Sequence, residues 1–283
     1  MYPMSFLEFI ESHQFHTFLL DVSGVLYSDA SGCFPEAVTA CQQMHEQGQI
    51  FLVTNNTCES PQQISSKLQK MGIDIPVSHV ISSGLGLHLD VETSQRLSGK
   101  SVFWVGNIEA CLAYLDGVDC QIVTELDQAD VMVIASSHGP ESGRYFDFLE
   151  DYLIKRPIPV ICCNPDHFVR GEAETLFPVA GFYAHCLWEA LESVHPNYPF
   201  YWIGKPHSNF SGVVRQVLES KDVVVDSKVC FFDDNSQNIS TLTHDLTCQG
   251  CWIYDTGIGF KQDALHESGF RSAFLGGQIL HNV

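Results

Sequence analysis

Four apolar segments of the chain end in residues that could do chemistry: Asp21, Thr54, Lys205 and the pair Asp233-Asp234. A carboxylate can take up a phosphoryl group as an aspartyl phosphate. A hydroxyl group and backbone amides can hold phosphate oxygens, and a lysine supplies a compact positive charge. Two adjacent carboxylates near a third suit Mg²⁺, which prefers oxygen ligands. The residue types therefore fit phosphoryl transfer, provided that the fold brings them together.

Each of these residues also has an ordinary structural explanation when it is taken alone. Lys205 could be a solvated loop lysine, and Asp233-Asp234 could cap the amino terminus of a helix. Thr54-Asn55 has the composition of a turn. Their combination at the ends of several strands of one predicted sheet is what favours a phosphotransfer site.

The segments before these residues are short and continuously apolar, which is typical of strands buried on both faces of a parallel sheet. Residues 17–20, 50–53 and 229–232 are examples, and helical patterns over 35–47 and 60–71 follow the first two. Strands that alternate with helices at this spacing predict a Rossmann-like, doubly wound parallel sheet. The carboxyl ends of its strands open onto one edge, so we expect the polar residues to converge there.

A second α/β unit is expected within the first, because the alternation continues over 83–192 with different loop sequences. Residues 201–203 have the pattern of a strand that rejoins the first sheet and leads to Lys205. We therefore predict a Rossmann-like catalytic core made of 1–82 and 193–283 and an inserted α/β cap domain of 83–192. The expected strands of the cap are 102–105, 131–134 and 160–163.

The composition excludes several classes of partner. The chain has 34 acidic and 14 basic residues, a formal charge of −20, which disfavours binding to nucleic acid or to an anionic membrane. It has no apolar run of membrane-spanning length and no recognisable secretory signal. Its 11 cysteines are odd in number, and several lie in apolar runs, which is typical of free thiols in a reducing compartment. We expect a cytoplasmic protein.

Two short motifs point to other functions. Gly84-Leu85-Gly86 follows a predicted strand and invites a dinucleotide-binding interpretation, but Leu89 stands where the third glycine would be. Cys248 and Cys251 form a CxxC motif, which can be redox-active or half of a zinc site. No second pair stands at ligand spacing, and Cys251 begins an apolar strand. We interpret both motifs as structural.

Taken in order, the motifs resemble those of the haloacid dehalogenase-like superfamily of phosphotransferases. Residues 21–26 (Asp-Val-Ser-Gly-Val-Leu) resemble its first motif and Thr54-Asn55-Asn56 its second. Gly204-Lys205-Pro206 is similar to the third and Asp233-Asp234 to the acidic fourth. A cap between the second and third motifs resembles the nitrophenylphosphatase-like branch, and Asn164-Pro165-Asp166 resembles a cap motif of that branch.

The resemblance implies a Mg²⁺-dependent phosphohydrolase that acts through an aspartyl phosphate. Asp21 would be the nucleophile and a metal ligand, and Ser23 would offer its backbone carbonyl to the metal ion. Asp234 would complete the metal site with help from Asp233.

The same resemblance implies how the substrate is held. Thr54 and Asn55 would bind the transferring phosphoryl group, and Lys205 would stabilise the charge of Asp21 and of the phosphate. The substrate would be a small phosphorylated molecule, chosen by the cap. Dimerisation through the cap is common in similar proteins, so the resemblance leaves a homodimer open.

Ser23 departs from the family pattern, since most of these phosphatases have an aspartate there that acts as general acid. The serine form is similar to that of phospholysine phosphohistidine inorganic pyrophosphate phosphatases, so it does not by itself imply an inactive enzyme. Without this acid, hydrolysis should favour good leaving groups, as in pyrophosphate, phosphoramidates and aryl phosphates. The alternative is a catalytically weak, phosphate-binding or regulatory protein of the same fold.

Overall fold

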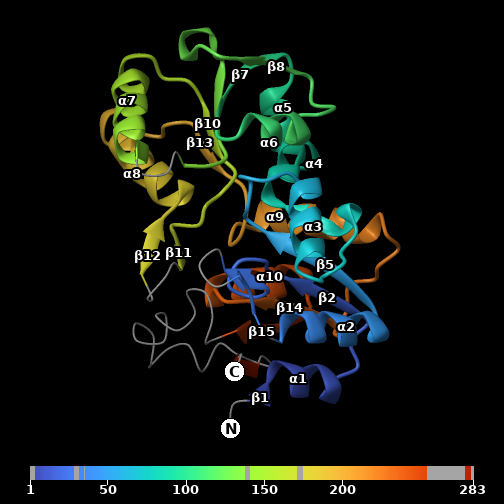
Figure 1. Ribbon diagram of the computed structural model, residues 1–283. Coiled ribbons are helices and arrows are strands. Elements are labelled where there is room, and N and C mark those ends of the chain that lie inside the picture. The colour runs from blue at the N-terminus through green and yellow to red at the C-terminus, as the bar shows by residue number, and fades with distance from the viewer. Residues whose placement is uncertain are drawn as a thin grey trace.

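The computed structural model describes residues 4–28, 32–34, 36–137, 141–170, 175–253 and 278–281. Within these residues the chain forms a seven-stranded and a five-stranded sheet, called here the first and the second sheet. Neighbouring strands are parallel throughout both sheets. The second sheet lies at the top of Figure 1 and the first sheet lies below it.

The first sheet has the strand order β1-β16-β15-β14-β2-β5-β6. Strand β2 lies inside the sheet, between β14 and β5, so the residue that follows β2 is enclosed on both sides. The strands are β1 (Met4–Ser5), β2 (Thr17–Leu20), β5 (Gln49–Thr54), β6 (Val80–Ser82), β14 (Val229–Asp233), β15 (Gln249–Ile253) and β16 (Gln278–His281).

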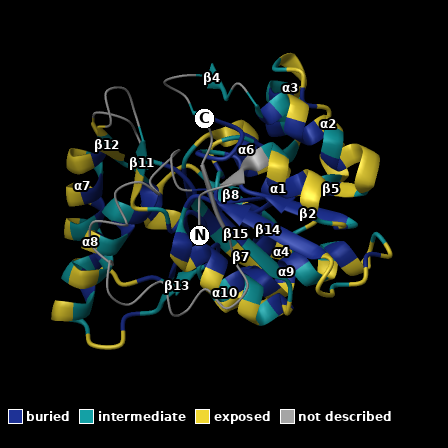
Figure 2. Ribbon diagram, turned by 90° about the horizontal axis from the view of Figure 1, so that it is seen from below, coloured by how far each residue is buried: buried dark blue, intermediate teal, exposed yellow. Residues whose placement is uncertain are grey.

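Helices cover both faces of the first sheet because successive strand residues point to opposite faces. Phe18 and Leu20 pack with α1, α2 and α3, whereas Leu19 and Phe231 pack with α9 and α10. Figure 2 shows the strands in dark blue between helices whose outer surfaces are yellow. The helices are α1 (Phe6–Ser12), α2 (Ala37–Gln47), α3 (Pro61–Lys70), α9 (Ser208–Glu219) and α10 (Ser236–Leu246).

The local signals at two of these helices have clear outcomes. Ser60 forms a capping box at the start of α3: its hydroxyl accepts from the backbone of Gln63, whose side chain accepts from the backbone of Ser60. Helix α2 begins at Ala37, and Pro35, which the pattern places in its first turn, lies outside the described residues.

The second sheet has the strand order β13-β10-β9-β7-β8. The prediction that 201–203 rejoins the first sheet is wrong, because β13 pairs with β10 of the second sheet. The chain therefore returns to the first sheet only after β13. The strands are β7 (Lys100–Val105), β8 (Cys120–Val123), β9 (Val131–Ile134), β10 (Val160–Cys162) and β13 (Phe200–Trp202).

Helices also cover both faces of the second sheet. Helices α7 and α8 pack on the face that includes Met132 and Val160, and α5 and α6 pack on the face that includes Val133. The helices are α4 (Gly86–Leu89), α5 (Val91–Leu97), α6 (Ile108–Tyr114), α7 (Ser142–Lys155) and α8 (Ala180–Val194). The remaining elements are the short helices η1 (Val77–His79), η2 (Ser83–Leu85) and η3 (Leu126–Gln128) and the antiparallel pairs β3 (Tyr27–Ser28) with β4 (Gly32–Cys33) and β11 (Phe168–Arg170) with β12 (Leu176–Pro178).

The two sheets face each other through the carboxyl ends of their strands. The Thr57 hydroxyl, after β5, donates to the carbonyl of Ala135, after β9. The Ser83 hydroxyl, after β6, donates to the carbonyl of Cys163, after β10. Loops that carry polar residues therefore meet between the sheets. The fold class is α/β, a Rossmann-like doubly wound core with a second α/β unit between β6 and β14.

The described part of the chain contains no helix that is long and apolar enough to cross a membrane.

Candidate active site

Asp21 lies directly after β2, at the edge that faces the second sheet. Its backbone N–H donates to the carbonyl of Phe232 in β14 at 2.8 Å, and the residue is only 8% exposed. The chain then turns back through Gly24, which has a φ of +89°. Such a backbone conformation favours glycine, so this part of the first motif has a steric cause.

Lys205 is buried between two carboxylates. Its Nζ atom lies 2.8 Å from Asp21 Oδ1 and 2.7 Å from Asp233 Oδ2. Gly204, directly before it, has a φ of +123°, and a Cβ atom there would lie 2.6 Å from Asn55 Oδ1. Only glycine fits this position, so the Gly-Lys sequence is what delivers the lysine to Asp21.

Asp233 is the last residue of β14, and its carboxylate is held by several donors. Besides Lys205, the backbone N–H of Asn235 donates to it at 2.7 Å, and the amide of Asn238 lies 3.2 Å from each oxygen. Asp234 is only 6% exposed. Its backbone carbonyl accepts from the Trp252 indole at 2.9 Å, which fixes the chain at this edge.

The charges of this cluster act strongly on one another because they are buried. Burial raises the pKa of Asp21 to about 6, although the Lys205 ammonium lowers it; the charge of Asp233 adds to the rise. Burial also raises the pKa of Asp233, again against the effect of Lys205. For Lys205 itself, burial lowers the pKa, but Asp21, Asp233 and Asp166 together raise it above its ordinary value. The lysine therefore stays charged at neutral pH.

Thr54 is the last residue of β5 and Asn55 follows it, at the same edge, as predicted from the sequence. Thr54 is buried, and its Oγ1 accepts from the backbone N–H of Asn56 at 3.1 Å. The Asn55 side chain is occupied by Lys205: its Oδ1 accepts from the lysine backbone N–H at 2.8 Å and its Nδ2 donates to the lysine carbonyl at 2.9 Å. Asn55 therefore positions Lys205 with its side chain.

Asp166 joins the site from the second sheet. It follows β10, and its Oδ1 accepts from Asn55 Nδ2 at 2.9 Å. Burial raises its pKa to about 6, Lys205 lowers it, and Asp21 raises it. The sequence pattern identified 164–166 as a motif but assigned it no role. Its position after a strand was the available signal, but only the contact between the two sheets reveals its partner.

The donor set fits a divalent metal ion. Asp21, Asp233 and Asp234 each place one carboxylate oxygen within 4.8 Å of the others. These three carboxylates and the ammonium of Lys205 leave a net charge of two negative units, which one divalent cation would neutralise. All the donors are oxygen atoms, as Mg²⁺ prefers. The buried Oδ1 of Asn238, whose amide contacts Asp233, makes no hydrogen bond to any described residue.

Ser23 lies beside this donor set, in the turn after Asp21. Its backbone forms a bridge with Tyr27, and the residue is partly exposed. The role of its carbonyl as a metal ligand stays a prediction.

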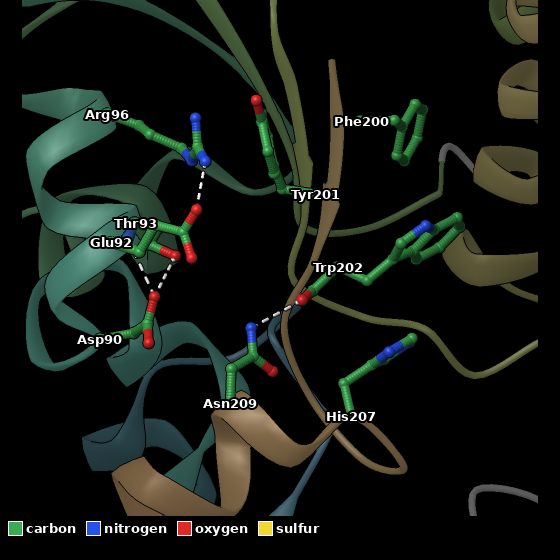
Figure 3. Close-up of a pocket in the computed structure, with 9 residues that line it drawn as sticks. All are labelled: Asp90, Glu92, Thr93, Arg96, Phe200, Tyr201, Trp202, His207 and Asn209. Atoms are coloured by element: carbon green, nitrogen blue, oxygen red, sulfur yellow. Dashed lines mark hydrogen bonds and ion pairs between the residues drawn. The ribbon is translucent and has the colours of Figure 1, made fainter. Parts of the chain in front are cut away.

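A separate cavity of about 260 Å³ lies where α5, β13 and the start of α9 meet. Figure 3 shows the Arg96 guanidinium close to the Tyr201 ring; the two are 3.7 Å apart. Arg96 also forms an ion pair with Glu92, and the rings of Trp202 and His207 stack. None of the residues that line this cavity is a predicted site residue.

The two alternative motifs have structural roles. A Cβ atom at Gly84 would lie 2.6 Å from the Tyr114 ring, and one at Gly86 would lie 2.5 Å from Ile203, so both glycines permit close packing. Cys248 and Cys251 are free cysteines, and burial raises the pKa of both thiols.

Comparison with known proteins agrees with this geometry. Residues 18–121 match the family model described as haloacid dehalogenase-like hydrolase. No curated protein matches the chain.

Several solved structures share the fold. One is a possible sugar phosphatase of the haloacid dehalogenase superfamily from Cytophaga hutchinsonii, with a TM-score of 0.75, 18% identity, and coverage of 99% of this chain and 97% of that chain. A glycerol phosphate phosphatase from Mycobacterium tuberculosis, in complex with magnesium, has a TM-score of 0.71 and 18% identity, with 96% and 76% covered. A p-nitrophenyl phosphatase from Archaeoglobus fulgidus has a TM-score of 0.71 and 17% identity, with 95% and 96% covered.

The site is thus a buried Asp-Lys-Asp cluster at the carboxyl edge of a doubly wound sheet, and a second α/β unit faces that edge. Over residues 18–121 the chain is similar to haloacid dehalogenase-like hydrolases, and it shares its fold with the solved structures.

Proposed function

We propose that the chain is a Mg²⁺-dependent phosphohydrolase that moves a phosphoryl group from a small phosphorylated substrate to Asp21 and then to water. The observation that carries this proposal is the Lys205 ammonium, held between Asp21 and Asp233 within the carboxylate cluster. A nucleophile, a fixed cation and a set of oxygen ligands thus share one edge of the sheet. Several of the structural neighbours are phosphatases, which supports the same reaction class.

In the first step an oxygen of Asp21 attacks phosphorus and the bond to the leaving group breaks. Lys205 holds the attacking carboxylate in place and neutralises charge on the phosphoryl oxygens. Thr54 binds a phosphoryl oxygen through its hydroxyl group, and Asn55 contributes its backbone amide, since its side chain already holds Lys205. Bound Mg²⁺, held by Asp21 and Asp234 with help from Asp233, would add the charge that draws the phosphate into this acidic site.

In the second step water hydrolyses the aspartyl phosphate and regenerates Asp21. The position two residues after the nucleophile holds Ser23 in place of a carboxylic acid, and a hydroxyl group is far too weak an acid at neutral pH to replace one. With the residues of the first sheet alone, substrates that release weak bases, such as pyrophosphate, phosphoramidates and aryl phosphates, should therefore react best.

Ser23 also motivates the alternative, a catalytically weak protein that binds phosphate. Against it stands the buried contact of Lys205 with two carboxylates, which phosphate binding alone does not need. Turnover of p-nitrophenyl phosphate separates the two functions. We expect release of nitrophenol that requires Mg²⁺ and is lost in Asp21→Asn. Phosphate binding with no turnover at any Mg²⁺ concentration would support the alternative.

The acidic surface and the free cysteines support a small-molecule substrate and a reducing compartment, and we propose a cytoplasmic location. A homodimer through the cap belongs to the same proposal. Sedimentation of the purified chain tests it, and a monomer at all concentrations would refute it.

A further inference from the structure

Asp166 is a carboxyl group that the second sheet brings to the edge of Asp21. Its Oδ1 accepts from Asn55 Nδ2 at 2.9 Å, and the same amide nitrogen donates to the carbonyl of Lys205 at 2.9 Å. Lys205 in turn contacts Asp21 at 2.8 Å. One asparagine and one lysine therefore link the nucleophile, on the first sheet, to a carboxyl group that the second sheet contributes.

The loop that carries Asp166 is fixed on the core. Pro165, directly before it, packs so closely on Gly204 that a Cβ atom there would lie 2.7 Å from the proline Cδ. Two residues earlier, the carbonyl of Cys163 accepts from the Ser83 hydroxyl. The position of Asp166 relative to Asp21 is thus set by several contacts and not by a single hydrogen bond.

This position suits a group that acts on the leaving oxygen. In an in-line displacement the leaving group departs on the side of phosphorus opposite the nucleophile. Asp21 attacks from the first sheet, so the leaving oxygen moves toward the second sheet, from which Asp166 extends. Asp166 is also partly exposed, so its carboxyl group is not sealed off from a substrate.

The charges around Asp166 favour its protonated form. The titratable groups that interact with it are Lys205, Asp21, Asp233 and the buried Cys162 thiol. The single ammonium is already shared by two carboxylates, and a substrate phosphate adds further negative charge. Burial raises the pKa of Asp166 to about 6, so a useful fraction carries a proton near neutral pH.

We propose that Asp166 is the general acid of the phosphohydrolase described above, on which this inference rests. As Asp21 forms its bond to phosphorus, the bond to the leaving oxygen breaks and that oxygen takes the proton of Asp166. An alcohol, aspartyl phosphate and an Asp166 carboxylate result. Water then attacks the aspartyl phosphate and passes its proton to Asp166, which restores both side chains and releases phosphate. Asp166 thus supplies what Ser23 cannot.

The neighbouring histidines are poorer candidates. The His167 and His185 rings lie 5.1 Å apart, and burial and the proximity of His185 lower the pKa of His167. Neither has a described contact with Asn55 or Lys205, so nothing ties either ring to the nucleophile.

Asp166→Asn tests the proposal, since asparagine can still accept the hydrogen bond from Asn55 but has no acidic proton. The measurement is kcat/KM for glycerol phosphate, an alkyl ester, and for p-nitrophenyl phosphate, whose leaving group is a weak base. We expect kcat/KM for the alkyl ester to fall by about 10²-fold or more, and that for the aryl ester to change little. Asp127→Asn, an exposed residue at the far edge of the second sheet, is the matched control and should change neither.

Two further readouts distinguish an acid from a residue that only positions Asn55. In the wild type the alkyl-to-aryl ratio of kcat/KM should rise as pH falls through about 6, and this rise should vanish in Asp166→Asn. Addition of Ser23→Asp to Asp166→Asn should restore alkyl turnover. Equal losses on both substrates, an unchanged pH profile of the ratio, or no rescue would overturn the role of Asp166. If the role of Asp166 is overturned in this way, aryl turnover that is lost in Asp21→Asn but kept in Asp166→Asn still supports the phosphohydrolase. If the wild type itself shows no turnover, the proposed function is overturned instead.

Discussion

Removal of the Lys205 ammonium should destabilise the metal-free protein strongly at neutral pH and much less at acidic pH. Lys205→Met keeps the length and apolar character of the side chain but leaves Asp21 and Asp233 without the cation that lies 2.8 and 2.7 Å from them. Both carboxylates are buried, and removal of one partner from a buried ionic group typically costs about 3–5 kcal/mol.

The pH dependence follows from the state that the mutant must adopt. The folded mutant can relieve the repulsion by protonating one carboxyl group, whose ordinary pKa is 3.8. Each pH unit above that value costs about 1.4 kcal/mol, which sets an upper limit to the deficit of about 5 kcal/mol at pH 7.5 and about 2 kcal/mol at pH 5. The wild type already bears part of this cost, because the pKa of its Asp21 is raised to about 6. A group whose pKa is raised in the folded state loses stability as pH rises, so the deficit of the mutant should grow from pH 5 to pH 7.5.

Urea denaturation in the presence of a chelator measures this deficit at both pH values. Lys228→Met, at an exposed position, is the control and should stay within about 0.5 kcal/mol of the wild type. A deficit of about 3–5 kcal/mol at pH 7.5 that shrinks to about 2 kcal/mol or less at pH 5 supports the buried cluster. Equal deficits at the two pH values, or none, would refute the electrostatic reasoning.

Three further results are expected. Asp21→Asn should abolish phosphatase turnover while its circular dichroism spectrum matches that of the wild type; residual activity at matched Mg²⁺ would remove Asp21 from the mechanism. Mg²⁺ at a hundredfold excess over its Kd should raise the free energy of unfolding of the wild type by about 3 kcal/mol, seen as a higher midpoint of thermal unfolding. Asp234→Ala should abolish this gain, and an equal gain in the mutant would place the metal elsewhere. Ser23→Asp should raise the alkyl-to-aryl ratio of kcat/KM strongly when Asp166 is replaced by asparagine and only slightly in the wild type, and an equal rise in both backgrounds would contradict the role of Asp166.

The sequence could predict the strand ends of the first sheet because they depend on local patterns. The apolar runs before Asp21, Thr54 and Asp233 form β2, β5 and β14, and the capping signals at Ser60 hold. The strand before Lys205 was assigned to the wrong sheet, since a short apolar run has the same pattern in either sheet. Its pairing with β10 depends on contacts that the pattern does not encode.

The candidate site was predicted as a set of residues but not as a network. The hydrogen bond between Asn55 and Asp166 joins residues 111 positions apart, on two different sheets. Whether Asn55 faces the substrate or holds Lys205 is decided by the loop at Gly204, which packs against its side chain. Sequence spacing carries no information about such contacts, so both roles emerged only from the assembled fold.

The transient phosphoenzyme is the most direct test of the central claim that Asp21 takes up the phosphoryl group. The protein is mixed with Mg²⁺ and p-nitrophenyl phosphate, quenched in acid within the first turnover, and analysed by peptide mass spectrometry. The account predicts one phosphoryl group on the peptide that contains Asp21, absent without Mg²⁺ and absent in Asp21→Asn. Turnover with a phosphoryl group on another residue, or with the same modification in Asp21→Asn, would contradict it.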